Sequence, residues 1–442
     1  MSELVTRIEA RASRPLATEQ LQAFADRETR LSRLLVTYIA TGLVFMLLPG
    51  TFLGVWNLIS ISSRRAADSV SPAWIQAHGH AQIFGWIGTF ILGIGFYSIP
   101  KLRRLDRFAL SAAWTSWALW TAGVTLRWGT GVAPWHWRIL LPLSAALELA
   151  AFLIFLRCVS GHRPQDSGRQ ALEEWVLVVI AACFGLLLTL AVNLGAAVFL
   201  AFRGSSPELP AAFDQRFLVL QTWGFLVPFV WGFSAKWLPV FLGLRPVRGR
   251  VLLGAVGLNG AGVVAALAGW TLPATVLLLA GIAVAIAALG ILEPAPRPAK
   301  VKGISSRFPL FVRLAYLWAA AAGMLGVWAA VASNPTGIWG ASRHALTVGF
   351  LALMVFAIGP RILPAFSGMR QLFSPQLMSA ALALLAAGCL IRVVSEILAY
   401  QELVQAAWHC LPISAVTELT AVTLFAANLV LTFRQPAPDS AR

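Results

Sequence analysis

Charged residues are scarce in this sequence of 442 residues: only 12% are Asp, Glu, Lys or Arg, whereas 58% are apolar. So apolar a chain does not stay disordered, and as a soluble domain it would have to expose much of its apolar surface. Apolar stretches of about 20 residues, each able to cross about 30 Å of hydrocarbon, recur along almost the whole chain. The composition therefore indicates a polytopic integral membrane protein and excludes a soluble enzyme.

Cysteine is also rare. The four cysteines form no CxxC pair, and most lie within or at the ends of apolar stretches: Cys158, Cys183, Cys389 and Cys410. This pattern supports neither a disulfide framework nor a zinc site. We also expect no cleavable signal peptide, because residues 1–33 form a charged, polar arm.

Twelve apolar stretches are predicted to span the membrane. Backbone amides in lipid must be satisfied within each segment, and the stretches lack the alternation of barrel strands, so the predicted fold is all-α. The predicted spans are 34–59, 75–99, 108–126, 139–156, 176–202, 217–242, 251–270, 272–292, 309–331, 344–364, 377–399 and 406–433.

The net charge of +16 could suggest a nucleic-acid partner, but the basic residues gather in alternate loops. Such loops face the cytoplasm in membrane proteins. Both termini are then cytoplasmic, the lipid bilayer is the partner, and nucleic acid needs no part in the explanation. The basic segments are 7–33, 101–107, 157–169, 245–250, 297–313, 361–370 and the region of Arg434.

Internal similarity divides the predicted helices into three groups of four. The string LPLSAALELAAFLIF in the fourth span matches LPISAVTELTAVTLF in the twelfth, which makes Glu148 and Glu418 equivalent. Membrane proteins often contain such repeats. We predict repeats at 34–161, 162–293 and 309–433, an N-terminal arm 1–33, a Pro-rich linker 294–308 and a tail 434–442.

The second and tenth spans repeat a histidine-to-proline spacing. It runs from His80 to Pro100 and from His344 to Pro364. In the third and eleventh spans Arg127 corresponds to Arg392. The middle repeat lacks the corresponding histidine and arginine and keeps Gln221, Pro239 and Pro273.

The predicted topology places five of the six histidines at the outer ends of helices and only His162 in the cytoplasm. We expect His136 and His409 to be surface residues. His344 and either His78 or His80 lie at matching depth in matching helices that are rich in small residues. Two neutral imidazoles facing each other across such a slot suit a flat, low-spin haem. The sequence therefore predicts a haem b site, with these three histidines as the candidate iron ligands.

The choice between the two histidines of the second span stays open at this point. Positions 78 and 80 are about 200° apart on a helix, so both side chains cannot face one iron. The repeat spacing favours His80, whereas alignment with Gly85 on one helical face favours His78.

Buried charges are the other candidate site residues. A carboxylate about 15 Å deep costs at least about 2.5 kcal/mol, so Glu148 and Glu418 either handle protons or pair structurally with Arg127 and Arg392. Near the outer surface Arg127, Arg343 and Arg392 are candidates to bind haem propionates, and Arg138 lies at a similar depth.

The segment HALTVGFLALMVFAIGPRILPAFSG from His344 resembles helix ten of the catalytic subunit of haem–copper oxidases. The segment HGHAQIFGWIGTFILGIGFYSIP from His78 is similar to their second helix. This resemblance implies twelve helices in three arcs, with low-spin haem ligands on helices two and ten. The oxidase copper histidines are missing, because Gln221, Trp223 and Asn259 occupy the helices that would carry them, and Ser342 replaces the high-spin haem ligand.

The His-x-His and His-Ala-Leu-Thr-Val-Gly motifs resemble more closely the NnrS family of twelve-helix haem proteins, although Ala81 stands where that family has Glu. The resemblance implies a protein of the bacterial cytoplasmic membrane that acts in nitric oxide metabolism or a related redox reaction. Nitric oxide and a quinol or another electron donor are the partners it implies, and copper is left open. The alternatives are a secondary transporter and an assembly or sensory protein that carries haem or copper.

Overall fold

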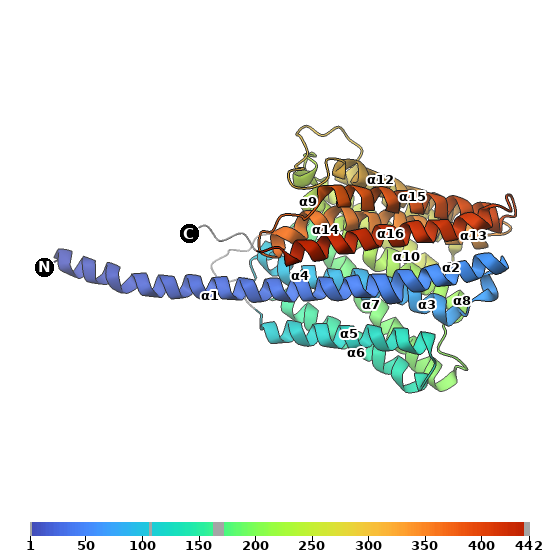
Figure 1. The fold of residues 1–442 in the computed structure, drawn as a ribbon, viewed down its shortest axis with the longest axis horizontal. Coiled ribbons are helices and arrows are strands. Elements are labelled where there is room, and N and C mark those ends of the chain that lie inside the picture. The colour runs from blue at the N-terminus through green and yellow to red at the C-terminus, as the bar shows by residue number, and fades with distance from the viewer. Residues whose placement is uncertain (1, 106–107, 162–171, 437–442) are drawn as a thin grey trace.

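The computed structural model describes residues 2–105, 108–161 and 172–436, and within these ranges it is helical, with no β-strand. The helices run side by side along the longest axis of the molecule (Figure 1). In chain order the α-helices are α1 (Ser2–Phe45), α2 (Leu53–Arg64), α3 (Pro72–His80), α4 (Thr89–Arg103), α5 (Leu110–Val132), α6 (Trp137–Val159), α7 (Glu174–Arg203), α8 (Ala211–Val219), α9 (Val227–Phe241), α10 (Gly249–Leu267), α11 (Thr271–Leu289), α12 (Phe308–Val331), α13 (Thr336–His344), α14 (Leu353–Phe366), α15 (Pro375–Tyr400) and α16 (Ala407–Arg434). The predicted all-α fold is confirmed for this part of the chain.

Several of these helices continue into one another through short irregular segments. A 3-10 turn, η2 (Ala67–Ser69), joins α2 to α3. Four π-helical segments link α-helices into longer spans: η1 (Met46–Phe52), η3 (Ala81–Gly88), η4 (Leu220–Leu226) and η5 (Ala345–Ala352). Each of these four spans therefore crosses the bundle with a local change in helical geometry.

Eleven helices among the described residues are long and apolar enough to cross a membrane. They coincide with eleven of the twelve spans predicted from the sequence: Gln22–Arg64, Pro72–Arg103, Trp137–Val159, Glu174–Arg203, Ala211–Phe241, Gly249–Leu267, Thr271–Leu289, Phe308–Val331, Thr336–Phe366, Pro375–Tyr400 and Ala407–Arg434. The remaining predicted span, 108–126, is the third in chain order and corresponds to α5. This helix has 23 residues and packs along α6, but its tryptophans and Arg127 lower its mean hydropathy.

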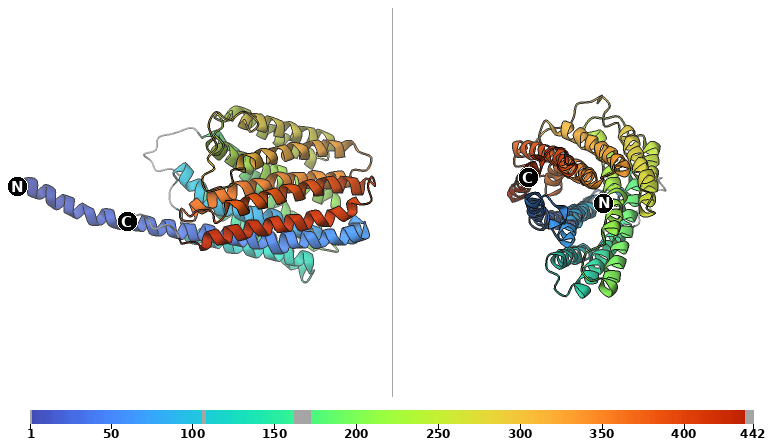
Figure 2. Two further views of the ribbon diagram at one scale, coloured as in Figure 1. Left: turned by 45° about the horizontal axis from the view of Figure 1, so that its top comes forward. Right: turned by 90° about the vertical axis from the view of Figure 1, so that its right-hand side faces the viewer.

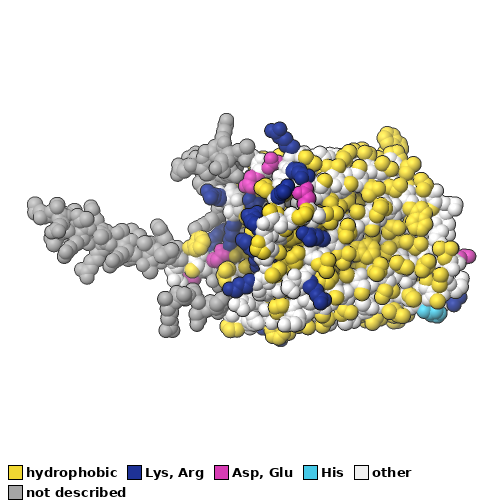
Figure 3. Space-filling model, turned by 90° about the horizontal axis from the view of Figure 1, so that it is seen from above, with side chains coloured by type: hydrophobic (Ala, Val, Ile, Leu, Met, Phe, Trp, Pro, Cys, Tyr) yellow, Lys and Arg dark blue, Asp and Glu magenta, His cyan; other side chains and the backbone are white. Residues whose placement is uncertain are grey.

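Basic side chains form a collar at one end of the bundle. Figure 3 shows Lys and Arg gathered where the N-terminal helix leaves the hydrophobic body, and a predominantly hydrophobic surface beyond them. The elements α3, α8 and α13 lie at the opposite end (Figure 1). This asymmetry is what the alternating basic loops of the sequence predict for a membrane protein.

The chain winds around the bundle so that its last helix returns to its first. The end-on view in Figure 2 shows the red C-terminal helices beside the blue N-terminal ones, and α16 packs against α2 and η1. Between the second and tenth predicted spans, Trp86 of η3 contacts Phe356 of α14, with ring centroids 6.1 Å apart. The first and third predicted repeats therefore share an interface.

Three of the π-helical segments occur at corresponding places. They begin at Ala81, Leu220 and Ala345, and each lies at the same distance ahead of a proline (81 to 100, 220 to 239, 345 to 364). A π-helical turn replaces i→i+4 hydrogen bonds by i→i+5 bonds, and such segments are frequent at functional sites. The fourth segment, η1, contains Pro49, whose missing N–H prevents a regular hydrogen-bond ladder.

Local capping sets where two site-bearing helices begin. The hydroxyl of Ser71 accepts a hydrogen bond from the backbone N–H of Ala73 at the start of α3. The hydroxyl of Ser374 does the same for Leu377 at the start of α15. In both helices proline follows the cap, where its fixed φ suits the first helical position. These starts determine the heights of His78 and Arg392 in the bundle.

Candidate functional site

A cavity of about 610 Å³ lies at the end of the bundle remote from the basic collar, and all four π-helical segments contribute to its wall. This volume is in the range of small-molecule sites in proteins, about 300–1,000 Å³. Seven of the eight candidate site residues from the sequence line it: His78, His80, His344, Arg127, Arg343, Arg392 and Glu418. Glu148 is not part of the lining. Residues from all three predicted repeats thus meet at one place.

His78 is held by the first span. Its ring Nδ1 lies 2.8 Å from the carbonyl oxygen of Gly50. Because a carbonyl oxygen only accepts hydrogen bonds, Nδ1 carries the proton of the neutral ring and Nε2 keeps a free lone pair. The ring packs against Gly54, where an added Cβ would lie 2.5 Å from the His78 Cε1. Two glycines of the first span therefore set the tautomer and the position of this half-buried imidazole.

His344 has a similar arrangement in α13. Its Nδ1 lies 2.9 Å from the carbonyl oxygen of Gly340, one helical turn earlier, and 3.0 Å from Oε2 of Glu396. Its other ring nitrogen, Nε2, therefore also keeps a free lone pair. The ring is partly accessible from the cavity, with 27% of the side chain exposed. A carboxylate on the far nitrogen of a histidine is the usual second partner of a metal-binding imidazole.

Glu396 is a site residue that the sequence analysis missed. It lies on α15, where its Oε2 is 3.4 Å from the Nε of Arg392, and its carboxylate packs directly against Gly340. The signal was present in the sequence, because Arg392 and Glu396 are four residues apart on a membrane-spanning helix. Residues at this spacing lie on one helical face, and ionisable residues inside a membrane mark functional sites.

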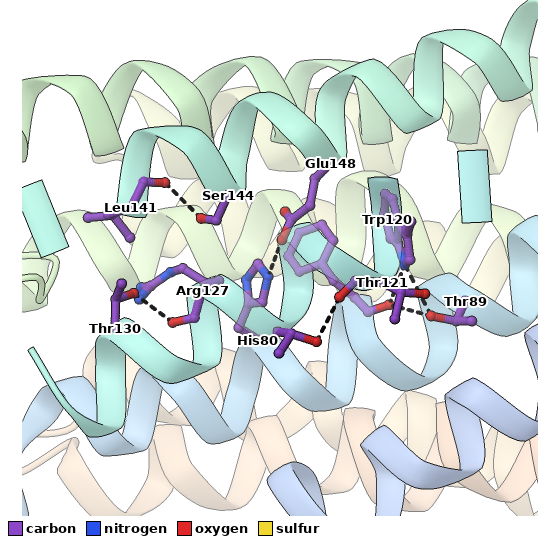
Figure 4. Close-up of polar contacts among 11 residues, drawn as sticks. His80, Thr89, Trp120, Thr121, Arg127, Thr130, Leu141, Ser144 and Glu148 are labelled. Atoms are coloured by element: carbon purple, nitrogen blue, oxygen red, sulfur yellow. Dashed lines mark hydrogen bonds and ion pairs between the residues drawn. The ribbon is translucent and has the colours of Figure 1, made fainter. Parts of the chain in front are cut away.

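His80 forms its hydrogen bond through the other ring nitrogen. Its Nε2 lies 2.8 Å from Oε1 of Glu148, and its ring stacks on Phe84 with centroids 4.5 Å apart (Figure 4). Only 7% of His80 is exposed, and Glu148 is fully buried. The nitrogen that is free in His78 and His344 is therefore occupied in His80. Of the two histidines of the second span, the structure gives His78 the same ring-nitrogen arrangement as His344.

The two intramembrane glutamates do not form the direct ion pairs with arginine that were one sequence interpretation. Among the described residues, the hydrogen-bonding partner of Glu148 is His80, and Arg392 pairs with Glu396 instead of Glu418. An oxygen of each glutamate, Oε2 of Glu148 and Oε1 of Glu418, has no hydrogen-bonding partner. Sequence spacing could not predict this, because several carboxylates and cations lie within reach of one another at this end of the bundle.

The glutamates nevertheless pack alike. The Cγ of Glu148 lies 2.8 Å from the position of an added Cβ on Gly123, and the Cγ of Glu418 lies 2.7 Å from that on Gly388. These glycines are one turn before Arg127 and Arg392 in helices α5 and α15. The same close helix packing therefore accompanies the matching sequence strings.

Four arginines line the cavity: Arg127, Arg216, Arg343 and Arg392. Arg127 is only 4% exposed, and its Nη1 has no hydrogen-bonding partner in the described structure; the same is true of Nη1 in Arg392. Arg343 is exposed, and Asp214 of α8 lies within electrostatic reach of Arg343 and Arg127. The arrangement can bind an anionic group of a ligand. Arg138 instead donates to the carbonyl oxygens of Ala201 and Gly204 and is not part of the lining.

The middle repeat contributes neutral side chains. Gln221 and Trp223 line the cavity. The Nδ2 of Asn259 donates to the carbonyl oxygen of Trp223 at 2.7 Å, so that this side chain supports η4 from behind. The hydroxyl of Ser342 donates to the carbonyl oxygen of Ala322 at 2.8 Å. Among the described residues, no group of three or more His, Cys, Asp or Glu side chains could hold a metal ion without further ligands.

The remaining histidines lie away from this cavity. His136 caps the start of α6, and His409 lies in the first turn of α16; both are exposed. The expectation that these two are surface residues is confirmed. His162 lies outside the described residues.

The model of a family described as a domain of unknown function, DUF8744, matches residues 218–433, which run from the end of α8 to the end of α16. No curated protein matches the chain. The matched region contains His344, Arg392, Glu396 and Glu418 but not the second span, and more than half of the cavity-lining residues lie within it.

Proposed function

We propose that this chain is a membrane protein that binds haem b between its second and tenth spans, with His78 and His344 as the residues that would hold the iron. One observation carries the proposal. Both histidines line one cavity, and a backbone carbonyl holds the Nδ1 of each, so that both Nε2 atoms are free to ligate. Bis-histidine ligation needs two neutral imidazoles in this tautomer.

The residues present fit the rest of the group. A haem combines a flat apolar ring with two anionic propionates. The cavity wall carries apolar side chains from η3 and η5, and the unpartnered Nη1 atoms of Arg127 and Arg392 can donate to propionate oxygens. Charge-assisted hydrogen bonds of this kind are about twice as strong as neutral ones. The buried arginines therefore gain partners when such a ligand binds.

When bound by both histidines, the haem would supply one-electron exchange. The chain's own residues orient and tune this chemistry. The carbonyl oxygens of Gly50 and Gly340 set the histidine tautomers, and Glu396 makes His344 a more basic ligand. The buried pair of His80 and Glu148 supports the second span from behind and keeps a carboxylate near the cavity.

This assignment extends to an architecture of three four-helix repeats like that of NnrS and the haem–copper oxidase catalytic subunits. The corresponding positions of η3, η4 and η5 ahead of Pro100, Pro239 and Pro364 support it, as does the shared packing of Glu148 and Glu418. The proposed role is nitric oxide metabolism or a related redox reaction in a bacterial cytoplasmic membrane, with both termini on the cytoplasmic side. The basic collar supports that orientation.

The test is the absorbance spectrum of the purified, dithionite-reduced protein. We expect sharp low-spin haem b bands that His344→Ala and His78→Ala each abolish, because either change removes an axial ligand. His80→Ala serves as the matched control and should keep the bands. A wild-type protein that binds no haem, or a His344→Ala variant with an unaltered low-spin spectrum, would contradict the proposal.

A secondary transporter is the second candidate function. Four spans change helical geometry around one cavity, and the cavity lining includes a glutamate with an unpaired oxygen, Glu418. Transporter sites are often built from interrupted helices and intramembrane carboxylates. Two results together would favour this function over the first. The purified protein would show no haem absorbance, and reconstituted vesicles would show proton-coupled uptake that is lost in Glu418→Gln.

A further inference from the structure

The cavity extends beyond the histidines into a part lined by other elements. We call this part the middle compartment and define it by six residues from α7, η4, α11, α12 and α13: Asn193, Gln221, Trp223, Thr275, Gly326 and Ser342. His78 and His344 are surrounded by different elements, since Gly54 is on α2 and Glu396 on α15. Ser342 and His344 are two residues apart on a helix and point about 200° apart. The compartment therefore lies on another side of α13.

Two side-chain amides of the middle compartment have unused hydrogen-bonding capacity. Gln221 is 6% exposed and makes no hydrogen bond with the described residues, and Asn193 is 5% exposed with no partner for its Nδ2. Burying an amide group without a hydrogen-bonding partner is unfavourable. Both amides line the cavity. A ligand that accepts hydrogen bonds there would remove this cost.

The two amides lie on helices that touch. An added Cβ on Gly185 of α7 would be only 1.9 Å from the carbonyl oxygen of Gly224 in η4, so the two backbones are in direct contact. Asn193 is on α7 and Gln221 on η4. One ligand with two acceptor oxygens can therefore bridge the two helices.

Thr275, Gly326 and Ser342 form a wall of small side chains. The two hydroxyl groups of this wall already donate hydrogen bonds to the protein. Thr275 donates to the carbonyl oxygen of Leu272, and Ser342 donates to that of Ala322. An added Cβ on Gly326 would lie 3.5 Å from Thr275 Cγ2 and 3.6 Å from Ser342 Oγ, which is ordinary contact. The wall thus offers a smooth surface to a flat ring. The indole of Trp223 adds an aromatic face from η4.

The six residues of the middle compartment are neutral, so the matching ligand is neutral as well. A flat apolar body with carbonyl oxygens that accept from the two amides would match these walls. We propose that the middle compartment binds the head group of a lipid-soluble quinone, with its carbonyl oxygens on Gln221 and Asn193. The binding does not depend on the haem of the proposed function; only the use of the quinone as a redox partner rests on it.

Equilibrium titration of the purified full chain in detergent with a short-chain benzoquinone tests the site. We expect saturable binding, reduced roughly fivefold by Gln221→Leu, which keeps the size of the side chain and removes the amide. Gly326→Val should block binding by filling the compartment, while Gly326→Ala should keep it. Gln371→Leu, a change of the same type at an exposed position, is the control.

His344→Ala separates this inference from the proposed function. The variant should lose the low-spin haem and bind the quinone with unchanged affinity. Absence of saturable binding in the wild type, or unchanged affinity in both Gln221→Leu and Gly326→Val, would overturn the quinone site while leaving the haem assignment intact. Circular dichroism melting of each variant identifies any that fail to fold. If Gly326→Val does not fold, the affinity of Gln221→Leu alone decides between the two outcomes.

Discussion

The second and tenth spans each pair a histidine with a glutamate, but the carboxylates take opposite nitrogens of the ring. In the second span Glu148 binds the Nε2 of His80. In the tenth span the carbonyl oxygen of Gly340 holds the Nδ1 of His344, Oε2 of Glu396 lies 3.0 Å from the same nitrogen, and Nε2 is left free. The same two residue types therefore give a closed pair in one region and an imidazole with a free nitrogen in the other. Which nitrogen is bonded, and not which residues are present, decides the chemistry.

The largest expected effect comes from displacing the carboxylate of the tenth span. Gly340→Ala would place a Cβ 1.9 Å from Oε1 of Glu396, so the carboxylate must leave His344. Overpacking of this kind costs about 1–3 kcal/mol, and we expect loss of most of the low-spin haem. Haem content per protein measures the effect.

Gly79→Ala is the matched control for that change, because an added Cβ at Gly79 has no atom within 4 Å. It should leave haem content and stability unchanged. Full haem occupancy in Gly340→Ala would show that the carboxylate does not position His344.

A smaller effect is expected from opening the closed pair. His80→Ala leaves Glu148 buried without its hydrogen-bonding partner, which costs about 1–3 kcal/mol. The melting temperature should fall while the low-spin spectrum persists. Thermal unfolding followed by circular dichroism, together with the reduced spectrum, measures both. If instead the low-spin spectrum is lost and the melting temperature is unchanged, His80 would be the haem ligand and His78 the structural residue of the second span.

The smallest effect is a change of redox potential in a protein that keeps its haem. Glu396→Gln removes the negative charge from the partner of His344 but keeps a hydrogen-bond acceptor at that position. A nearby negative charge stabilises the oxidised haem, which is the more positive state. Without that charge the midpoint potential should rise by roughly 60 mV, which is about 1.4 kcal/mol for one electron. Spectroelectrochemical titration measures the shift.

Glu148→Gln is the matched control for this change, since Glu148 contacts His80 and is not part of the cavity lining. It should leave the midpoint potential within the error of the measurement. Equal shifts in the two variants would mean that overall charge, and not contact with His344, sets the potential.

Much of the fold could be predicted from the sequence. The spans were readable because each must be apolar over the thickness of a bilayer, and all but the Trp-rich α5 also meet a strict measure of hydropathy and length. The π-helical segments were not readable. Pro49 accounts for one of them, and the sequences of the other three carry no proline within the segment.

The candidate site was predicted as a set of residues but not as a set of contacts. Histidines and arginines at one end of apolar helices stood out, since such residues are costly there. Glu396 was missed, Glu148 contacts a histidine and not an arginine, and Arg392 pairs with Glu396 and not with Glu418. Carboxylates, cations and imidazoles can exchange partners by small helix rotations, which a one-dimensional pattern does not contain.

The sequence by itself determined the class of the protein, its all-helical fold and the end of the bundle at which the ionisable residues lie. These follow from hydropathy, from backbone hydrogen bonding in lipid and from the placement of positive charge. The tertiary structure decided which histidine of the second span matches His344. Helix rotation and the carbonyl of Gly50 direct His78 to the cavity, whereas Glu148 on another helix occupies His80, and both depend on contacts between spans far apart in the chain.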